Sequence, residues 1–441
     1  MHNDIASPSA IADRLDRLPL SRWHRRMVLL IGLGAFFSFF EVALGSFFGV
    51  LLNTQWTLTA ADKSMIVGSA FLGEMIGSLT LAPLADRFGR RRMFQVNLIA
   101  YAALSLAAAL SPNLTVFLVL RVLTGIGLGA ELTLVDTYLS ELLPARRRGR
   151  YIAWSYTFGL TAAPVAGILA KSATGTILGL AGWRWLLILA AGGGLVAWLS
   201  RRRLPESPRW LATTGRLAEA DRVVTAIERE TGAPLDDPAP VPPAATRPDP
   251  GRYRRRSVLM WLMWIFTPIG FYAFASIAPI VLLAKGFDLA HSLTYSALTA
   301  AGYPLGSLAS VYLTERFERR TLVIASTLAA AASGVVFGLG TVTGVIITAG
   351  VATTVSTIVQ SNAVHIYQCE LFHTANRSTA IGMPYAASRL ISALLPFGAI
   401  ALLSAAGASG LYLGCAVLLV VMAIVARWLG PRTNNQRLDE I

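Results

Sequence analysis

Six ionisable residues lie inside long apolar stretches of this chain of 441 residues. An ionisable side chain at bilayer depth costs roughly 2.5–3.5 kcal/mol on insertion scales, so each such residue suggests a function. A carboxylate can bind and release a proton, whereas a guanidinium stays charged and can hold a carboxylate through two hydrogen bonds. The set therefore predicts proton binding and anion binding inside a membrane: Glu41, Glu74, Arg121, Glu131, Asp136 and Arg389.

Glu41 and Arg121 are expected to lie at a similar depth. Glu41 follows the start of an apolar run at residue 27 by 14 residues, about 21 Å of helix. Arg121 follows Pro112 by nine residues, about 13 Å from the opposite side of a ~30 Å core. We therefore expect the two to pair, with Glu41 as the proton carrier because arginine keeps its charge. The alternative is a static pair that only fixes two helices.

Two further charges have less obvious partners. Glu74 stands between Gly73 and Gly77, and is either a second proton site or a hydrogen-bonding partner of a neighbouring helix. Arg389 lies about 15 Å into its apolar run, which contains no acid. We predict that Arg389 binds the carboxylate of a substrate. The alternative is an ion pair with another helix, through Glu41 or Glu74.

Aromatic and amide side chains in the same runs are candidates for a pocket around a flat ring that carries a carboxylate. Ordinary helix packing is the more common role of any one of them. The predicted substrate contacts, besides Arg389, are Tyr156, Tyr272, Tyr303, Gln360 and Asn362.

The composition requires a membrane around these residues. The chain is 54% hydrophobic and 14% charged, whereas soluble domains carry about a quarter charged residues. This excludes a soluble enzyme and a nucleic-acid-binding protein, despite the net charge of +14. No strand-like alternation is present. We predict an all-α membrane protein with twelve transmembrane helices near 27–52, 63–84, 93–111, 114–137, 151–171, 183–200, 257–284, 291–313, 321–340, 343–366, 378–403 and 409–428.

The basic residues predict the orientation in the membrane. The N-terminal tail, alternate loops and C-terminal tail hold 32 of the 38 Lys and Arg residues. The positive-inside rule then places both termini in the cytoplasm, in a multi-pass protein of the cytoplasmic membrane. The polar N-terminus is not a secretory signal. The predicted parts are a tail (1–26), a six-helix bundle (27–200), a linker (201–256), a second bundle (257–428) and a tail (429–441). Within the linker we expect an amphipathic helix over 216–230 and a flexible Pro-rich stretch over 233–250.

The two predicted bundles repeat each other in sequence. The loop that starts at Asp86 matches the loop that starts at Glu315, at an offset of 229 residues. Tyr138, Glu141 and Arg148 recur at the same offset as Tyr367, Glu370 and Arg377. Two loops that share one offset indicate duplication, and parallel six-helix halves are a transporter architecture.

Four motifs carry a family resemblance over essentially the whole chain. They are Asp86-Arg-Phe-Gly-Arg-Arg91, Arg121-Val-Leu-Thr-Gly-Ile-Gly-Leu-Gly129, Tyr138-x-x-Glu-x-x-Pro-x-x-x-Arg148 and Pro205-Glu-Ser-Pro-Arg-Trp-Leu211. Together they resemble the major facilitator superfamily, and most closely its sugar-porter-like metabolite:proton symporters and organic-ion relatives. The resemblance implies an acid in span 1 paired with the span-4 arginine, and an arginine in span 11 in organic-anion members. Ala82, Glu318 and His373 depart from the motifs, which puts local turn geometry in doubt.

The remaining charges near the cytoplasmic ends of the spans are expected to form a gating network. Glu131 and Asp136 should lie near Arg87, Arg90 and Arg148, Glu141 should pair with Arg148, and Glu370 with Arg377. We expect rupture of such pairs to be a gating step. The complete predicted network is Asp86, Arg87, Arg90, Glu131, Asp136, Glu141, Arg148, Glu315, Arg319, Glu370 and Arg377.

The sequence thus predicts a secondary transporter that couples protons to uptake of a small organic anion, with an aromatic carboxylate as the best candidate. No ATP-binding loop, metal motif or catalytic triad is found, so we expect no cofactor, no metal and no enzymatic activity. The expected partners are a small-molecule substrate, protons and membrane lipid, and we expect a monomer. The alternatives are a proton-antiport exporter of drugs or metabolites, a sugar or polyol porter and, least favoured, a sensor.

Overall fold

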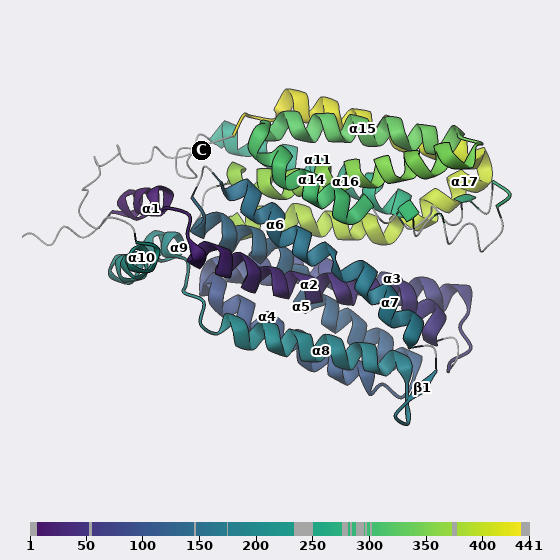
Figure 1. Ribbon diagram of the computed structural model, residues 1–441, viewed down its shortest axis with the longest axis horizontal. Helices are drawn as coiled ribbons and strands as arrows, with labels where there is room; N and C mark the ends of the chain where they lie inside the picture. Colours follow the sequence, from purple (N-terminus) through teal and green to yellow (C-terminus); the bar gives the residue numbers. More distant parts are fainter. Residues whose placement is uncertain are drawn as a thin grey trace, which may run out of the picture. The chain divides into compact units, whose positions relative to one another are not determined.

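The computed structural model is predominantly helical (Figure 1). It describes residues 7–52, 55–144, 147–173, 175–232, 250–275, 302–372 and 377–433, and isolated residues between 281 and 299. The predicted Pro-rich stretch lies outside the described residues, except for its last residue, which begins a helix. Two compact units are present, residues 1–249 with 369–386 and 435–441, and residues 250–368 with 387–434. Each unit is described separately below.

The first unit contains the helices of the first predicted bundle. Their bounds are α2 (Arg22–Leu51), α3 (Ala60–Phe88), α4 (Arg90–Ala109), α5 (Leu114–Leu142), α6 (Arg148–Leu160), α7 (Ala162–Ser172) and α8 (Gly182–Arg201). The span predicted at 151–171 is present as one candidate membrane-spanning stretch, Arg148–Ala170, in which α6 and α7 are separated only at Thr161. The break at Thr161 has a physical cause, because Pro164 cannot donate to the carbonyl four residues earlier. A two-residue ribbon, β1 (Thr176–Ile177) and β2 (Leu180–Ala181), precedes α8.

Two glycine pairs let α3 and α5 approach closely. A Cβ on Gly73 would lie 2.1 Å from the Val122 carbonyl oxygen, and one on Gly129 would lie 2.1 Å from that of Glu74. Gly77 and Gly125 make similar backbone contacts. This is the small-xxx-small packing that membrane helices use in place of hydrophobic association.

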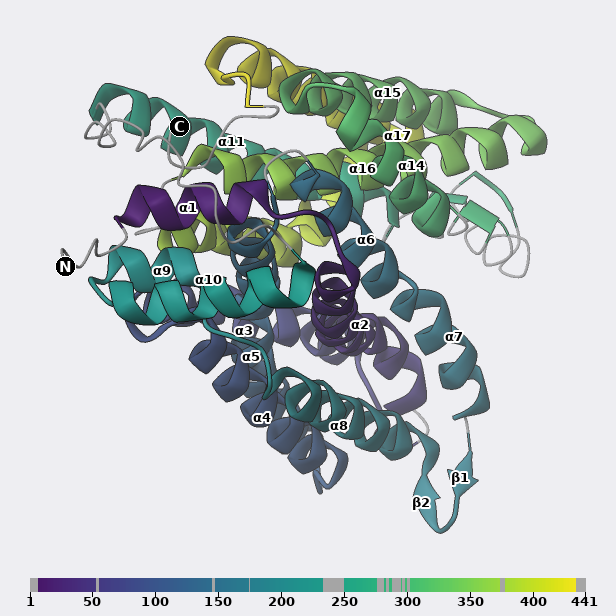
Figure 2. The ribbon, with the colours of Figure 1, turned by 60° about the vertical axis from the view of Figure 1, so that its left-hand side comes forward.

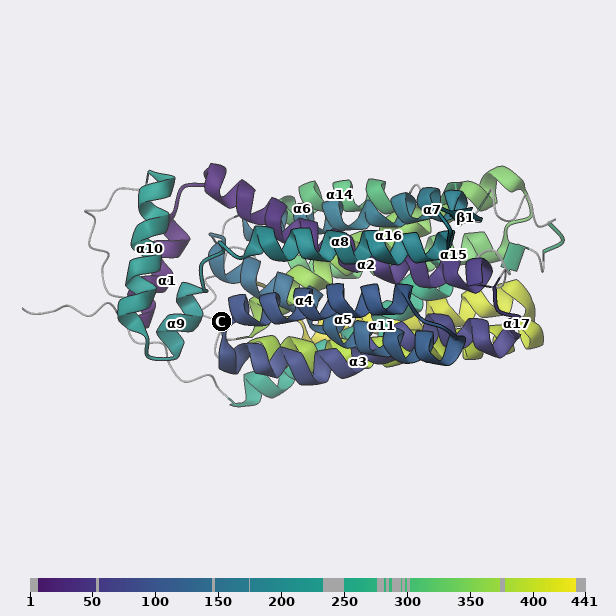
Figure 3. The ribbon, with the colours of Figure 1, turned by 90° about the horizontal axis from the view of Figure 1, so that it is seen from below.

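Three helices lie across one end of this unit, roughly perpendicular to its long helices (Figure 3). They are α1 (Pro8–Arg17), α9 (Pro208–Thr213) and α10 (Leu217–Thr231), which lie beside one another in Figure 2. Arg14 of α1 bonds Asp221, Thr225 and Glu228 of α10, and Ile11 and Leu15 are fully buried. The predicted amphipathic helix at 216–230 is therefore present. The N-terminal segment predicted as a plain tail instead forms a docked helix.

The second unit contains α11 (Pro250–Ala275), α14 (Gly302–Arg316), α15 (Arg319–Leu339), most of α16 (Thr343–Leu371) and most of α17 (Arg377–Leu429). The two last predicted spans are joined in α17, which breaks at Gly407, where φ is +67°. By length and composition, nine helices in the described part of the chain can span a membrane. Parts of the spans predicted at 257–284 and 291–313 fall outside the described residues.

The sequence repeat has a structural counterpart inside each unit. Tyr138 donates to the Pro205 carbonyl at 2.5 Å, and its repeat mate Tyr367 donates to the Pro431 carbonyl at 2.5 Å. The helix contact also recurs. A Cβ on Gly306 of α14 would lie 2.8 Å from the Val355 carbonyl oxygen of α16, as Gly77 of α3 meets α5. Duplication therefore extends from the loop motifs to the packing of the helices.

Two of the basic residues that lie outside the positively charged loops cap helix C-termini. Arg184 donates to the carbonyls of Ala109 and Ser111 at the end of α4. Lys285 donates to the carbonyls of Phe337 and Gly340 at the end of α15, at 3.0 and 2.6 Å. Cations at this position satisfy unpaired carbonyls and complement the helix dipole.

Candidate functional site

The Glu41–Arg121 pair joins α2 and α5 in the core of the first unit. Arg121 Nη1 forms an ion pair with Glu41 Oε1, and the Ser105 hydroxyl lies 3.4 Å from Oε2. Gly45, one turn after Glu41, leaves room for the guanidinium, since a Cβ there would lie 3.0 Å from Nη2. The pairing predicted from helix depth is present. Its role in proton coupling stays a prediction.

The surroundings of this pair are mostly apolar. The Arg121 guanidinium lies 5.3 Å from the centre of the Phe48 ring, a cation–π contact. Nε and Nη2 of Arg121 are buried without a hydrogen-bond partner. A buried ion pair whose donors are only partly satisfied gains less from pairing than it loses by desolvation. Such a pair is suited to open when the carboxylate takes up a proton.

Glu131 does not join the gating network as predicted. It pairs with Arg201 at the end of α8, with Nη1 and Oε1 2.6 Å apart. Arg201 also donates to the Leu30 and Ile31 carbonyls of α2. Gly34 is the residue that makes this possible, because a Cβ there would lie 2.0 Å from the guanidinium. The sequence places Arg201 at the start of the predicted linker, whereas the fold buries it.

Asp136 is bound by a tyrosine of the neighbouring helix α6. It accepts a hydrogen bond from the Tyr156 hydroxyl at 2.9 Å, and both side chains are buried. Tyr156, a predicted substrate contact, therefore links α6 to α5. The contact lies within the first unit, and a substrate role for Tyr156 stays a prediction.

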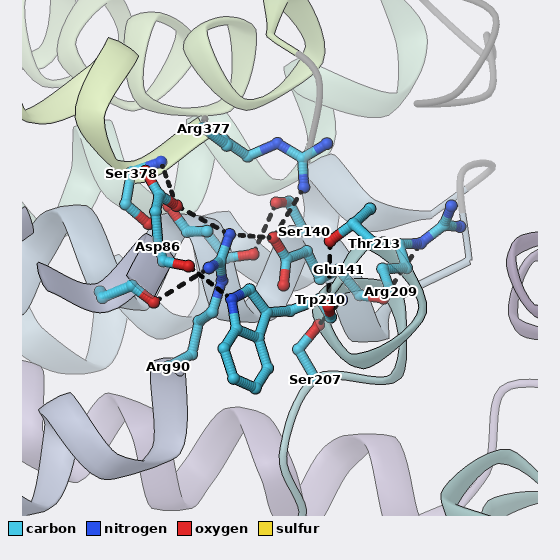
Figure 4. Close-up of polar contacts among 12 residues, drawn as sticks. Asp86, Arg90, Ser140, Glu141, Ser207, Arg209, Trp210, Thr213, Arg377 and Ser378 are labelled. Atoms are coloured by element: carbon cyan, nitrogen blue, oxygen red, sulfur yellow. Dashed lines mark hydrogen bonds and ion pairs between the residues drawn. The ribbon is translucent and has the colours of Figure 1, made fainter. Parts of the chain in front are cut away.

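Glu141 is the centre of a buried charge network (Figure 4). One of its oxygens, Oε1, accepts from both Arg90 and Arg377 at 3.1 Å, and all three side chains are fully buried. Arg209 of α9 donates to the Glu141 carbonyl at 3.2 Å and pairs with Asp16 of α1 at 2.9 Å. The expected partner of Glu141 was Arg148, so the network is present with a different pairing.

Asp86 caps the N-terminus of α17 from the end of α3 (Figure 4). It accepts from the backbone N–H of Ser378 at 3.3 Å and of Thr379 at 2.8 Å, and from the Thr379 hydroxyl at 2.8 Å. Arg90 pairs with it at 3.0 Å. A carboxylate at a helix N-terminus satisfies unpaired N–H groups and complements the dipole. The C-terminal end of α3 therefore holds the first turn of α17.

The other predicted gating residues have mixed outcomes. Arg148 is fully buried, but its three guanidinium nitrogens make no hydrogen bond in the described structure. Arg87 is exposed and lies over the Phe88 ring, without an ion pair to the described residues. Arg319 is buried and donates to the Thr314 carbonyl, the repeat of the bond from Arg90 to Ala85. Glu370 is buried and Glu315 is exposed. The expected partner of Glu370 was Arg377, which pairs with Glu141 instead.

In the second unit, the structure brings Arg389 next to Tyr272. The Arg389 Nη1 donates to the Tyr272 hydroxyl at 3.0 Å, and the guanidinium lies 6.0 Å from the ring centre. Phe271 is in edge contact with both Tyr272 and Tyr303, at centroid distances of 4.8 and 5.8 Å. Arg389 is 8% exposed. A buried cation against an aromatic ring suits a flat anion.

The two predicted amides contact different neighbouring helices. Gln360 donates to Thr267 of α11 at 3.0 Å, whereas Asn362 donates to Ser310 of α14 at 2.7 Å. Residues two positions apart on a helix are rotated by about 200°, so Gln360 and Asn362 face different neighbours. Both amides are used in helix packing.

The comparisons with known proteins decide the family. A family model described as "Sugar (and other) transporter" matches residues 28–441. The chain belongs to the sugar (and other) transporter family. It is therefore a multi-pass membrane transporter, and not an enzyme, with the all-helical fold of the major facilitator superfamily.

Individual relatives of this transporter are informative. It is 27% identical to the niacin transporter NiaP of Acinetobacter baylyi, over 98% of this chain and 99% of the relative. It is 30% identical to the 4-hydroxybenzoate transporter PcaK of Pseudomonas aeruginosa, over 69% of each chain. The solved proton:xylose symporter XylE, bound to 6-bromo-6-deoxy-D-glucose, matches with a TM-score of 0.79 and 19% identity, covering 95% of this chain and 98% of that one.

Glu206 of the transporter is a helix-capping residue that the sequence analysis did not single out. Its Oε1 accepts from the backbone N–H groups of Arg90 and Arg91 at 3.0 and 3.2 Å, and so caps α4. Burial raises the pKa of Glu206 above the ordinary glutamate value, although hydrogen bonds from the backbone N–H groups of Ser207 and Arg91 oppose the rise. The signal was available, because Glu206 belongs to the Pro205–Leu211 motif and Gly89, with φ +98°, offers no side-chain cap.

Proposed function

We propose that this transporter is a proton-coupled symporter that takes up a small organic anion, an aromatic or heteroaromatic carboxylate, by alternating access. The observation that carries the proposal is the placement of Arg389 against the Tyr272 hydroxyl. Phe271 extends the aromatic surface, because its ring contacts those of both Tyr272 and Tyr303. A guanidinium supplies two parallel donors to a carboxylate, and the rings offer flat apolar surface. That NiaP is named for niacin and PcaK for 4-hydroxybenzoate supports the same class of substrate.

Proton coupling is assigned to Glu41. Its carboxylate is the only titratable member of the pair at physiological pH, because Arg121 stays protonated. Protonation of Glu41 cancels the attraction that holds α2 to α5 at this level, and frees the guanidinium to seek another acceptor. The pair is thus a two-state element whose equilibrium a proton gradient biases.

The gating role belongs to the network around Glu141 and Asp86. Both residues hold the segment that begins α17, Glu141 through Arg377 and Asp86 through the N–H groups of Ser378 and Thr379. We propose that these contacts form and break as the transporter changes state, on the cytoplasmic side of the membrane, where both termini lie.

Comparing nicotinate with nicotinamide tests the substrate assignment. The two rings are nearly isosteric, and only the former carries a carboxylate. We expect nicotinate, and not nicotinamide, to raise the melting temperature of the purified transporter. Arg389→Gln should lose the difference in melting temperature between the two ligands, whereas the matched control Tyr412→Phe, a buried change in the same unit, should keep it.

If nicotinate raised the melting temperature of the wild type and of Arg389→Gln equally, Arg389 would not be part of the substrate site. A response of the wild type to sugars or cationic drugs instead would favour the porter or exporter alternatives.

A further inference from the structure

A groove of about 620 Å³ lies in the first unit between the start of α2, the segment that follows α8 and helix α10. Its floor is apolar and buried, made by Trp23 and Met27 of α2 and Ile227 of α10. Its rim carries three arginines, one from each of the three segments: Arg26, Arg203 and Arg222. The mechanism proposed above uses none of these residues.

The arginines on the rim have guanidinium N–H groups that are available to a ligand. Arg26 and Arg203 make no hydrogen bond or ion pair with the described part of the chain, and Arg222 donates only to the Ala218 carbonyl, at 3.2 Å. Two acids, Glu219 and Glu230, also line the groove. Glu219 is paired with Arg216 at 2.5 Å, so its charge is already compensated. The groove as a whole is cationic, and guanidinium groups favour phosphate oxygens.

The groove opens at the boundary between water and membrane. The apolar run of α2 begins at Met27, and Leu29, at 60% exposed, faces away from the protein as a lipid-facing residue does. Trp23 stands one turn before Met27, at the level where tryptophan is enriched in membrane proteins. Helix α10 lies across this end of the bundle (Figure 3). Leu30, which also lines the groove, follows Arg26 by one helical turn on the same face.

We propose that this groove binds an anionic phospholipid, with the phosphodiester between Arg26, Arg203 and Arg222. The acyl chains leave the groove along Met27 and Leu30 toward the bilayer. The apolar floor is the reason to assign a lipid over a free anion, because a hydrated ion gains nothing from Trp23 and Met27. A bound lipid bridges α2 and α10, and so fastens the surface helices to the first transmembrane helix.

The two helices offer a matched pair of variants for the test. Arg26→Gln/Arg222→Gln removes two charges from the rim. Arg25→Gln/Arg229→Gln removes two charges from exposed positions of the same helices that do not line the groove. Each full-length protein is purified in detergent and mixed with dihexanoyl phosphatidylglycerol, dihexanoyl phosphatidylcholine or inorganic phosphate. Melting temperature and native mass spectrometry report binding.

The expected result is a larger rise in melting temperature with phosphatidylglycerol than with phosphatidylcholine, for both the wild type and the Arg25/Arg229 variant. The Arg26/Arg222 variant should bind phosphatidylglycerol on the order of tenfold more weakly, since each charge-assisted hydrogen bond contributes strongly. Equal binding by the two double variants would overturn the site, as would a stabilising effect of inorganic phosphate as large as that of the lipid. An unchanged phosphatidylcholine response in all proteins shows that the rim variant is folded.

Discussion

The Glu41 carboxylate and the Arg121 guanidinium form an ion pair that solvent does not reach, with side chains 0% and 1% exposed. The pair connects the first and fourth long helices of the first unit. Gly45 leaves room for the guanidinium, and the Phe48 ring lies over it. Because the pair is enclosed, a proton reaches Glu41 only when the helices around it move. This enclosure is what makes the pair suitable for coupling rather than for simple binding.

Glu41→Gln should uncouple transport from the proton gradient. Glutamine keeps the size and one acceptor oxygen but carries no exchangeable charge, so accumulation driven by a pH gradient should fall to the level of equilibration. Exchange of labelled for unlabelled substrate should persist. The measurement is uptake and counterflow in proteoliposomes.

Glu131→Gln is the matched control for this variant. It removes a charge from another buried pair of the same unit, Glu131 with Arg201, and should keep accumulation while lowering stability. Accumulation by Glu41→Gln at the wild-type level would show that another group carries the proton.

Glu141→Gln should destabilise the transporter strongly. Two buried guanidinium groups, of Arg90 and Arg377, share one oxygen of this carboxylate. Without it, Arg377 would lose the counter-charge of Glu141, and Arg90 would keep only its pair with Asp86. Removing one partner of a buried pair costs about 3–5 kcal/mol. The melting temperature in detergent measures the effect, with Glu219→Gln, an exposed ion-pair member, as a control that should change little. If the melting temperature of Glu141→Gln fell no more than that of Glu219→Gln, the network would contribute nothing to the stability of the described state.

Gly129→Ala should weaken the packing of α3 on α5. The added Cβ would lie 2.1 Å from the Glu74 carbonyl oxygen, which is backbone and cannot move aside alone. Overpacking of this kind costs about 1–3 kcal/mol. Gly192→Ala is the control, since its Cβ meets nothing within 4 Å and alanine favours the helix. If Gly129→Ala melts at or above the wild-type temperature, the close approach of these helices is not required.

The stability of the transporter should carry a pH dependence from Glu206. Burial raises the pKa of Glu206 in the folded state, so the folded protein holds its proton to higher pH than the unfolded chain does. The stability contributed by this residue is therefore complete below about pH 4.3, the ordinary glutamate value, and is lost as pH rises through the folded pKa. The melting temperature of Glu206→Gln should increase relative to that of the wild type as the pH rises across this window. Melting temperatures of both proteins from pH 4 to 8 provide the measurement, and a constant difference would contradict the assignment.

The sequence predicted the elements that depend on local pattern. Apolar length located the long helices, and a constant offset of 229 located the repeat, which the structure shows again in the bonds of Tyr138 and Tyr367. Counting helical rise from each end of a span predicted the Glu41–Arg121 pair, because depth along a straight helix follows from residue number alone. The sequence did not predict the break at Thr161, which depends on a local effect of Pro164. It also did not predict the helix of the N-terminal segment, which depends on docking to other elements.

Choice of partner could not be predicted in the same way. Glu141, Arg90, Arg148 and Arg377 were all expected near one another, yet which guanidinium reaches the carboxylate depends on the rotation of each helix about its axis. Rotation also separates Gln360 from Asn362. The predicted linker begins at Arg201, whereas the structure buries this residue, and Gly34 leaves the space for its guanidinium.

The most direct test of the account is accumulation of labelled nicotinate or 4-hydroxybenzoate by proteoliposomes under an imposed pH gradient, acidic outside. The account predicts that wild-type protein accumulates one of these carboxylates above equilibrium, and that a protonophore abolishes the accumulation. It further predicts that Glu41→Gln equilibrates the substrate without concentrating it. Transport of these carboxylates that does not respond to the pH gradient, or to the protonophore, would contradict proton-coupled symport.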